Sequence, residues 1–151
     1  MSPRSDELIE AARRRLAAAS VVVDQDPSAA LSAAYYAMLY AARAALSERD
    51  VTAKTHRGVW HELRRVFVET GELDADLASA VQKIQPEREQ ADYDAWFAPA
   101  SDATNAIELA QKFLATIEEL TGPGSDEAQQ LRGSESAKKC ARRESNPRPA
   151  V

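Results

Sequence analysis

One segment of the sequence constrains the fold more than any other, because apolar residues recur through it at the spacing of an α-helix. This stripe within residues 27–46 comprises Leu31, Tyr35, Met38, Ala42 and Leu46. Asp26 is a suitable N-cap, and Pro27 suits the first helical position because a proline has no N–H to leave unpaired there. Alanines crowd the flanks of the stripe and leave room for close neighbours. The segment therefore predicts a buried helix in close contact with other helices.

Four further segments show helical periodicity, and no segment is predicted to form a strand. The five helices are expected over about 5–23, 27–46, 55–71, from Asp74 or Asp76 to Pro86, and over about 101–121. Thr55 is the expected N-cap of the third helix and Gly71 its expected C′ residue. Pro86 should kink or restart the fourth helix, which sets the segment EREQADYD at 87–94 apart. Amphipathic helices with short connections predict an all-α, five-helix up-and-down bundle.

Composition limits the class of protein. The chain of 151 residues is long enough for one domain with its own core. A net charge of −5 argues against a dedicated duplex-DNA binder. No apolar run approaches the roughly 20 residues of a membrane span, and the N-terminus lacks the apolar core of a signal peptide. A single cysteine, Cys140, fits a reducing compartment. We therefore expect a cytoplasmic protein that does not associate with membranes.

The helical pattern ends at Gly122, where a Gly-Pro-Gly sequence interrupts it. Residues 1–121 are predicted to form the domain, and 122–151 a disordered tail that is polar and basic. A basic tail could touch RNA, but we interpret it as an inert extension. One codon choice for Glu144 to Arg148 is complementary to the T-arm of a tRNA gene, which suggests a read-through extension into a neighbouring gene. The opposite strand of the genomic DNA would then carry a tRNA gene.

The first candidate site lies in the segment after Pro86. Arg88 and Asp92 are spaced as an intrahelical ion pair, and Tyr93 follows directly. A surface salt bridge would explain the pair without any function. However, Ile84, Arg88 and Asp92 continue the apolar stripe of the fourth helix, so the guanidinium should face inward or into a groove. An arginine held there by a carboxylate is a suitable ligand for phosphate or for an RNA backbone.

The second candidate site is the start of the third helix, where Lys54, His56 and Arg57 form a small cationic cluster. Helix N-termini bind anions, although a solvated helix end would look the same in the sequence. The two histidines, His56 and His61, do not have the i, i+4 spacing of a shared metal site, so no metal is expected. No phosphate-binding glycine loop or catalytic triad is present, and we expect no cofactor. The tyrosines of the second helix are predicted to be core and interface residues.

Taken together, DPSAALSAAYYAMLYAARAAL, KTHRG and the R-x-x-x-DYD segment resemble the HEPN domain, in the branch whose members have the R-x-x-x-DY ending. The resemblance covers roughly residues 5–121. It implies a helical bundle that forms a two-fold homodimer. It also implies a small nucleotidyltransferase partner encoded nearby and a role in a toxin–antitoxin module. Many such toxins are metal-independent endoribonucleases, which use an arginine followed four to six residues later by a histidine.

The sequence departs from this motif in one position. Arg88 matches the arginine of the family, but Tyr93 stands where the histidine would fall, and no histidine follows Arg88. Arg49 and His56 roughly match the spacing, at the junction between the second and third helices, and we interpret this match as accidental. Without an imidazole, acid–base cleavage of RNA lacks its usual proton carrier near neutral pH.

Two functions therefore remain open. In the first, the protein is an RNA-directed toxin in which Arg88, Asp92 and Tyr93 are catalytic, with His56 as a substitute imidazole. In the second, it is a non-catalytic HEPN subunit that binds RNA or nucleotide through Arg88, Lys54, His56 and Arg57, or regulates its nucleotidyltransferase partner. A helical interaction dimer without a ligand is a third alternative.

Overall fold

The computed structural model describes residues 2–85 and 97–122. Every regular element within these ranges is helical and none is a strand, so the predicted all-α fold class is confirmed for this part of the chain. A single π-helical turn, η1 (Arg64–Val68), directly follows α3. The α-helices of the described ranges are α1 (Pro3–Val22), α2 (Pro27–Ser47), α3 (His56–Leu63), α4 (Ala75–Gln82) and α6 (Ala100–Thr121).

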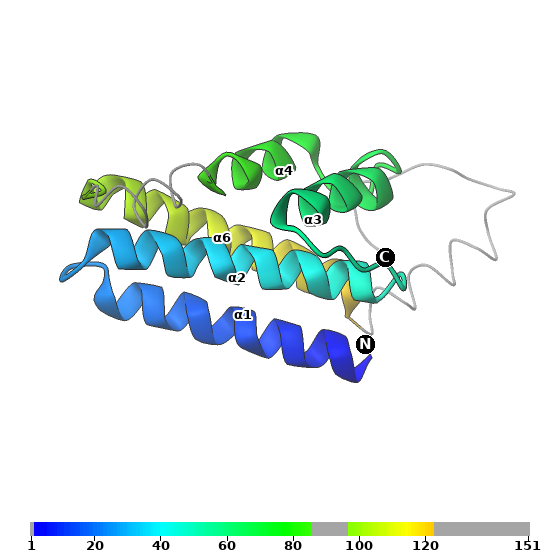
Figure 1. Ribbon diagram of the computed structural model, residues 1–151, viewed down its shortest axis with the longest axis horizontal. Helices are drawn as coiled ribbons and strands as arrows, with labels where there is room; N and C mark the ends of the chain where they lie inside the picture. The colour runs from blue at the N-terminus through cyan, green and yellow to red at the C-terminus, as the bar shows by residue number, and fades with distance from the viewer. Residues whose placement is uncertain (1, 86–96, 123–151) are drawn as a thin grey trace, which may run out of the picture.

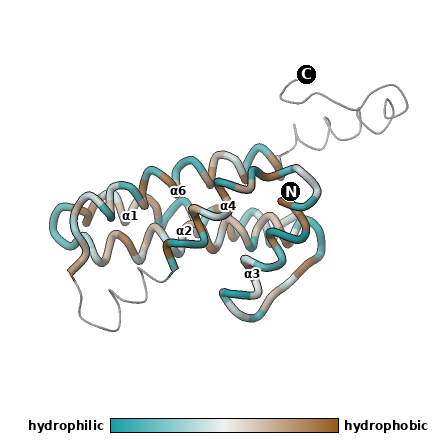
Figure 2. Tube along the Cα trace, turned by 90° about the horizontal axis from the view of Figure 1, so that it is seen from above, coloured by the Kyte–Doolittle hydropathy of each residue, from teal (hydrophilic) through white to brown (hydrophobic). Residues whose placement is uncertain are grey.

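The three long helices α1, α2 and α6 run side by side along the long axis of the molecule, and the shorter α3 and α4 lie over them (Figure 1). Contacts between elements are concentrated on α2, which packs against α1, α6 and α3. Hydrophilic and hydrophobic residues alternate along the helices, as expected for helices that bury one side (Figure 2). No helix in the described ranges is long and apolar enough to cross a membrane.

The predicted stripe of α2 forms the centre of the core. All five of its residues are at most 1% exposed, and this confirms the buried helix that the sequence predicts. The facing side of α6 contributes further fully buried side chains, and its Phe113 meets the ring of Trp60 edge-on at a centroid distance of 6.4 Å. The alanines of α2 at positions 30, 34, 37, 41, 44 and 45 are also buried, which allows its neighbours to approach closely.

Side-chain caps define the starts of three helices where the sequence predicts them. Asp26 accepts a hydrogen bond from the backbone N–H of Ala29 at 3.1 Å, and Pro27 is the first residue of α2. Asp74, the first of the two predicted alternatives, caps α4. Gly71 has a φ of +84°, so this turn uses a conformation that favours glycine. The helix boundaries thus follow local chemistry that can be read from the sequence.

The start of α1 is bound to the end of α2 by a carboxylate. Glu48 Oε2 accepts hydrogen bonds from the Ser2 backbone N–H at 2.8 Å and from the Ser5 hydroxyl at 2.7 Å. Burial alone would raise the pKa of Glu48, but the hydrogen bonds from Ser2 and Ser5 outweigh it, and the pKa lies below its ordinary value. The ionised carboxylate therefore helps to hold these two helix ends together.

Two predictions from the sequence fall on parts of the chain outside the described residues. The kink at Pro86 and the segment EREQADYD lie within residues 86–96. The predicted tail, residues 122–151, lies outside the described residues except for Gly122. Both therefore stay predictions.

Candidate functional site

The structure covers one of the two candidate sites. Arg88, Asp92 and Tyr93 lie outside the described residues, so their roles stay predictions. Lys54, His56 and Arg57 do lie together at the N-terminal end of α3, as the sequence predicts. The two cations are exposed and His56 is half-buried.

A glycine and a threonine shape this helix start. Thr55 is the N-cap of α3, and its hydroxyl accepts a hydrogen bond from the Gly58 backbone N–H at 2.9 Å, which confirms the predicted cap. A Cβ atom at Gly58 would lie 2.9 Å from Thr55 Oγ1 and 3.3 Å from the Cβ of Ala53. The KTHRG sequence therefore combines a cap with the one residue type that lets the cap approach closely, and this fixes the position of His56.

A chain of hydrogen bonds anchors His56 to the core. Tyr35, which is fully buried on α2, accepts a hydrogen bond at its Oη from Trp60 Nε1 at 3.2 Å. The same Oη lies 3.3 Å from His56 Nδ1. Because an indole nitrogen only donates, Tyr35 Oη is the acceptor in its bond with Trp60, and towards His56 Nδ1 it can either donate or accept. Donation from Tyr35 would place the proton of a neutral His56 on Nε2, which would then be a hydrogen-bond donor.

Two more tyrosines continue from His56 along α2 towards α1. The ring of Tyr36 packs edge-on against His56 at a centroid distance of 5.9 Å and lies 6.2 Å from the ring of Tyr40. The guanidinium carbon of Arg15 on α1 lies 5.7 Å and 5.6 Å from the centroids of these two tyrosine rings. Both tyrosines are half-buried and Arg15 is exposed. We call Arg15, Tyr36, Tyr40 and His56 the tyrosine strip.

The strip has the chemistry of a surface for single-stranded nucleic acid. Aromatic rings can stack on bases, and cations beside them attract phosphates. An arginine over a tyrosine ring adds a cation–π contact, worth about 0.5–1 kcal/mol at an exposed site. Lys54 and Arg57 extend the positive charge at the His56 end. The α2 tyrosines are predicted to be core and interface residues, and the core role is confirmed for Tyr35. Tyr36 and Tyr40 are half-exposed, and their role in an interface stays a prediction.

Arg49 is engaged elsewhere, which supports treating its spacing to His56 as accidental. Its guanidinium donates to both carboxylate oxygens of Glu72, with the shorter bond from Nη2 to Oε1 at 2.6 Å. It also lies over the ring of Phe67, 4.6 Å from the centroid. Arg49 therefore connects the end of α2 to the turn after η1.

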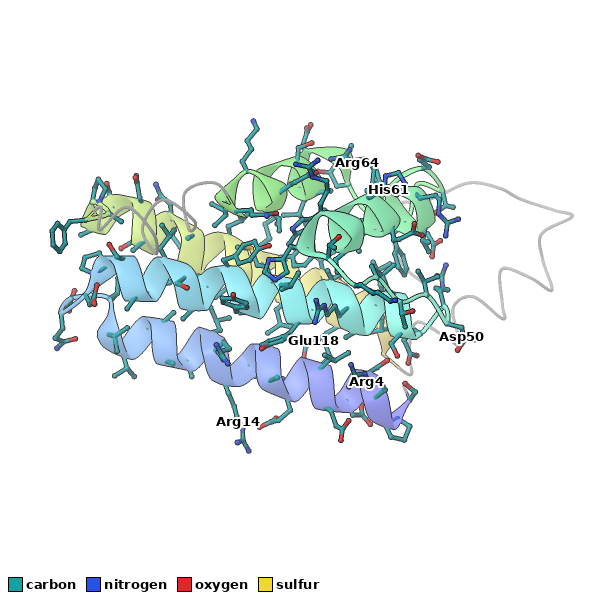
Figure 3. All side chains as sticks on the ribbon, viewed as in Figure 1. Arg4, Arg14, Asp50, His61, Arg64 and Glu118 are labelled. Carbon is teal, nitrogen blue, oxygen red and sulfur yellow. The ribbon has the colours of Figure 1, made fainter. Side chains whose placement is uncertain are left out.

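Metal binding has no candidate within the described ranges. No group of three or more His, Cys, Asp or Glu side chains in residues 2–85 and 97–122 is arranged to hold a metal ion. The histidine at the other end of α3, His61, is exposed and carries none of the strip's contacts (Figure 3).

Sequence reasoning found His56 but missed its supports. Trp60 lies one helical turn beyond His56, which is a usable signal for two side chains on one face. Arg15 gave no such signal, since its contact with Tyr36 and Tyr40 depends on how α1 packs on α2.

The fold and the strip define an all-helical domain with a cationic and aromatic surface. Comparison with known proteins identifies the family of this domain, because the HEPN domain model matches residues 5–120. The chain belongs to the HEPN domain family. It is also similar to a protein of Methanocaldococcus jannaschii named Putative toxin MJ0142, with 33% identity over 91 residues. That match covers 60% of this chain and 62% of the relative, so the chain spans less than two thirds of the relative's length.

Proposed function

We propose that this protein is the HEPN component of a toxin–antitoxin module, that it acts on or binds RNA, and that it works with a small nucleotidyltransferase partner. Membership of the HEPN family and the toxin designation in the name of the M. jannaschii relative support the toxin-type role. We also propose that the protein is cytoplasmic, because the RNA it would bind is cytoplasmic. It would form a homodimer, as HEPN domains commonly do.

The observation that carries the RNA part of the proposal is the tyrosine strip. It joins a histidine anchored by Tyr35 and Trp60 to two half-exposed tyrosines under an arginine. With Tyr35 as the donor to Nδ1, Nε2 of a neutral His56 can donate a hydrogen bond and suits a phosphate oxygen. The tyrosine rings suit bases, whose faces are all aromatic whatever the sequence. A single strand would find both chemistries on neighbouring helices.

Arg88, Asp92 and Tyr93 complete the proposal from the sequence. Arg88 is the proposed phosphate ligand, and Asp92 would orient its guanidinium through the i, i+4 spacing. His56 is the proposed source of the imidazole that the motif lacks. In a metal-independent cleavage the 2′ oxygen of the RNA would attack phosphorus and lose its proton to water, while cationic His56 would donate a proton to the leaving 5′ oxygen.

A non-catalytic HEPN subunit is the alternative, and a specific observation favours it. When Tyr35 donates to His56 Nδ1, a neutral His56 has no acceptor on Nε2, so the ring would bind a ligand and not remove a proton. The sequence also has no histidine after Arg88. Such a subunit would bind RNA or nucleotide, or regulate its nucleotidyltransferase partner.

Expression from an inducible promoter tests the toxin role. The full chain would be induced alone and together with the neighbouring gene, and growth would be scored. Growth arrest that the neighbour relieves supports the toxin. Normal growth in both cases, with soluble protein present, would contradict it.

Two arginine variants make the growth test specific. Arg88→Ala should abolish the arrest, because it removes the proposed phosphate ligand. Arg14→Ala should leave the arrest unchanged, since the Arg14 side chain is 79% exposed and its partner is Glu10 one turn away. Equal toxicity of the two variants would mean that Arg88 does not contribute. RNA recovered from arrested cells separates the two functions, because a catalytic toxin leaves cleaved RNA and a binding subunit does not.

A further inference from the structure

A second cationic feature, which includes no residue of the tyrosine strip, lies where α1 begins and α2 ends. Tyr36, Tyr40, Arg43 and Ser47 follow one another at helical spacing along the half-exposed side of α2. At the Ser47 end this side borders a pocket of about 120 Å³. The pocket is lined by Arg4, Leu8, Arg43, Leu46, Ser47, Val51, Thr52 and Ala53.

The pocket lies where α1 begins and α2 ends. Arg4 belongs to the first turn of α1, and Asp50 marks the turn after α2 (Figure 3). Asp50 has a φ of +57°, a left-handed conformation that Asp tolerates better than most residues, and the backbone turns there. The chain then returns along the pocket through Val51 and Thr52. Two helices and a loop thus form its walls.

The two arginines of the pocket have no counter-charge. Neither Arg4 nor Arg43 forms an ion pair or side-chain hydrogen bond with any residue of ranges 2–85 and 97–122. Arg43 Nε is moreover buried without a hydrogen-bond partner, the one side-chain polar atom of the described residues in that state. The nearby carboxylate of Glu48 is bound to Ser2 and Ser5 instead. An unpaired buried donor is unfavourable unless something else binds to it.

The shape of the pocket and its donors indicate the chemistry of the missing partner. Arg4 and Arg43 bring guanidinium groups to the pocket, and Ser47 and Thr52 bring hydroxyls. Guanidinium groups bind carboxylates and phosphates, but donors from two helices and a loop can use more than the two oxygens of a carboxylate. The volume is sufficient for several water-sized groups, since one water needs about 10–15 Å³ of such space. Leu8, Leu46, Val51 and Ala53 lower the local dielectric, which strengthens a charge-assisted hydrogen bond.

We propose that the Arg4–Arg43 pocket binds a phosphate group. The group can come from a free phosphate, from a nucleotide or from the backbone of a single-stranded RNA. Arg43 and Tyr40 are neighbours on the same side of α2, so the pocket and the tyrosine strip could hold one ligand together. The inference does not rest on the proposed function, because the pocket would bind phosphate in a protein without toxicity as well.

The thermal midpoint of the full chain, followed while phosphate is added at constant ionic strength, tests the proposal. Phosphate should raise the midpoint in a saturable way. Acetate at the same ionic strength should not, because it is planar and has only two oxygens. An equal response to both anions would overturn the proposal.

Arg43→Met separates a ligand-binding arginine from a structural one. Methionine fills similar space and removes the unpaired donor, so the midpoint in phosphate-free buffer should stay the same or rise. The response to phosphate should disappear. A lower midpoint with the response intact would overturn the proposal and make Arg43 structural.

Arg4→Gln is the second variant, and it keeps the test decisive if Arg43→Met fails to fold. It should weaken phosphate binding at least tenfold, which corresponds to about 1.4 kcal/mol. The matched control is Arg14→Gln, which removes a cation from the same helix at an exposed position and should bind phosphate as the native chain does. An equal loss of phosphate affinity in both variants would mean a general charge effect and would overturn the proposal that the pocket binds phosphate.

Competition then identifies the source of the phosphate. Inorganic phosphate, adenosine monophosphate and a single-stranded RNA oligonucleotide would each be titrated against the native chain and against Arg4→Gln. If Arg4→Gln weakens the affinity for inorganic phosphate or the mononucleotide but not for RNA, the pocket is a small-ligand site. An RNA affinity that depends on Arg4 identifies a backbone phosphate. Independence from Arg4 for all three ligands would overturn the proposal.

Discussion

Arg43 and Arg49 are both half-buried near the end of α2, yet they have opposite surroundings. Arg49 is held by both carboxylate oxygens of Glu72 and lies over the ring of Phe67. Arg43 faces α1 with a buried Nε that has no partner in the described residues. On the α3 side of α2 the polar groups satisfy one another, as in a structure that has only to be stable. On the α1 side Glu48 is satisfied by Ser2 and Ser5, but Arg43 Nε is not satisfied by any described residue, and that is typical of a group whose partner is a ligand.

A substitution in the apolar core should give the largest loss of stability, against which the effects at the two arginines can be compared. Phe113 is fully buried and contacts Trp60. Phe113→Ala should lower the free energy of unfolding by about 3–5 kcal/mol, because it removes the ring and leaves a cavity. Urea unfolding followed by circular dichroism measures this value. A loss below about 1 kcal/mol would contradict a close-packed core between α3 and α6.

The two arginines should respond differently to the loss of what surrounds them. Glu72→Ala leaves the half-buried Arg49 without its carboxylate and should cost about 1–3 kcal/mol. Arg43→Met should cost nothing or stabilise the free protein. Parallel urea unfolding of both variants measures the difference. Equal losses of unfolding free energy in the two variants would contradict the distinction between a structural Arg49 and a ligand-binding Arg43.

Tyr35→Phe should have a smaller effect, because it keeps the buried ring and removes only the hydroxyl. Trp60 Nε1 and His56 Nδ1 would lose their shared partner, at a cost of about 1 kcal/mol. Tyr40→Phe is the matched control and should stay within about 0.5 kcal/mol of the native chain. Nitrogen NMR of His56 would report its tautomer. A neutral ring protonated on Nδ1 in the native chain would mean that Tyr35 accepts from His56, and it would contradict Nε2 as the donor to phosphate.

Glu48 should give the smallest effect, and it depends on pH. Its pKa is lower in the folded chain than its ordinary value, so its stabilisation is fully present above the ordinary pKa. The stabilisation is lost as the pH falls through the lower folded pKa. Glu48→Gln should therefore flatten the acid side of the stability curve and change little at low pH. An unchanged acid slope, measured by thermal unfolding from pH 7 downwards, would show that another carboxylate is responsible.

Most of the fold could be predicted from the sequence because it depends on local chemistry. The stripe of α2, the caps at Asp26 and Thr55 and the turn at Gly71 all act within a few residues. The π-helical turn η1 was missed, since a fifth-neighbour hydrogen bond such as that from Glu69 N–H to the Arg64 carbonyl has no simple sequence pattern.

The candidate site was harder to predict because it combines separate helices. Lys54, His56 and Arg57 are sequence neighbours and could be grouped in advance. Arg15 and Tyr40 meet only because α1 packs on α2, and the pocket of Arg4 and Arg43 needs that packing together with the turn at Asp50. Helix pairing of this kind is set by the whole core, so no short motif encodes it.

The measurement that tests the central claim most directly is the affinity of the full chain for a single-stranded RNA oligonucleotide, with Arg15→Ala compared against Arg14→Ala. Both variants remove one exposed cation from α1, but only Arg15 lies over the rings of Tyr36 and Tyr40. An RNA-binding tyrosine strip predicts that Arg15→Ala binds several-fold more weakly than Arg14→Ala. Equal affinity of the two variants would contradict it.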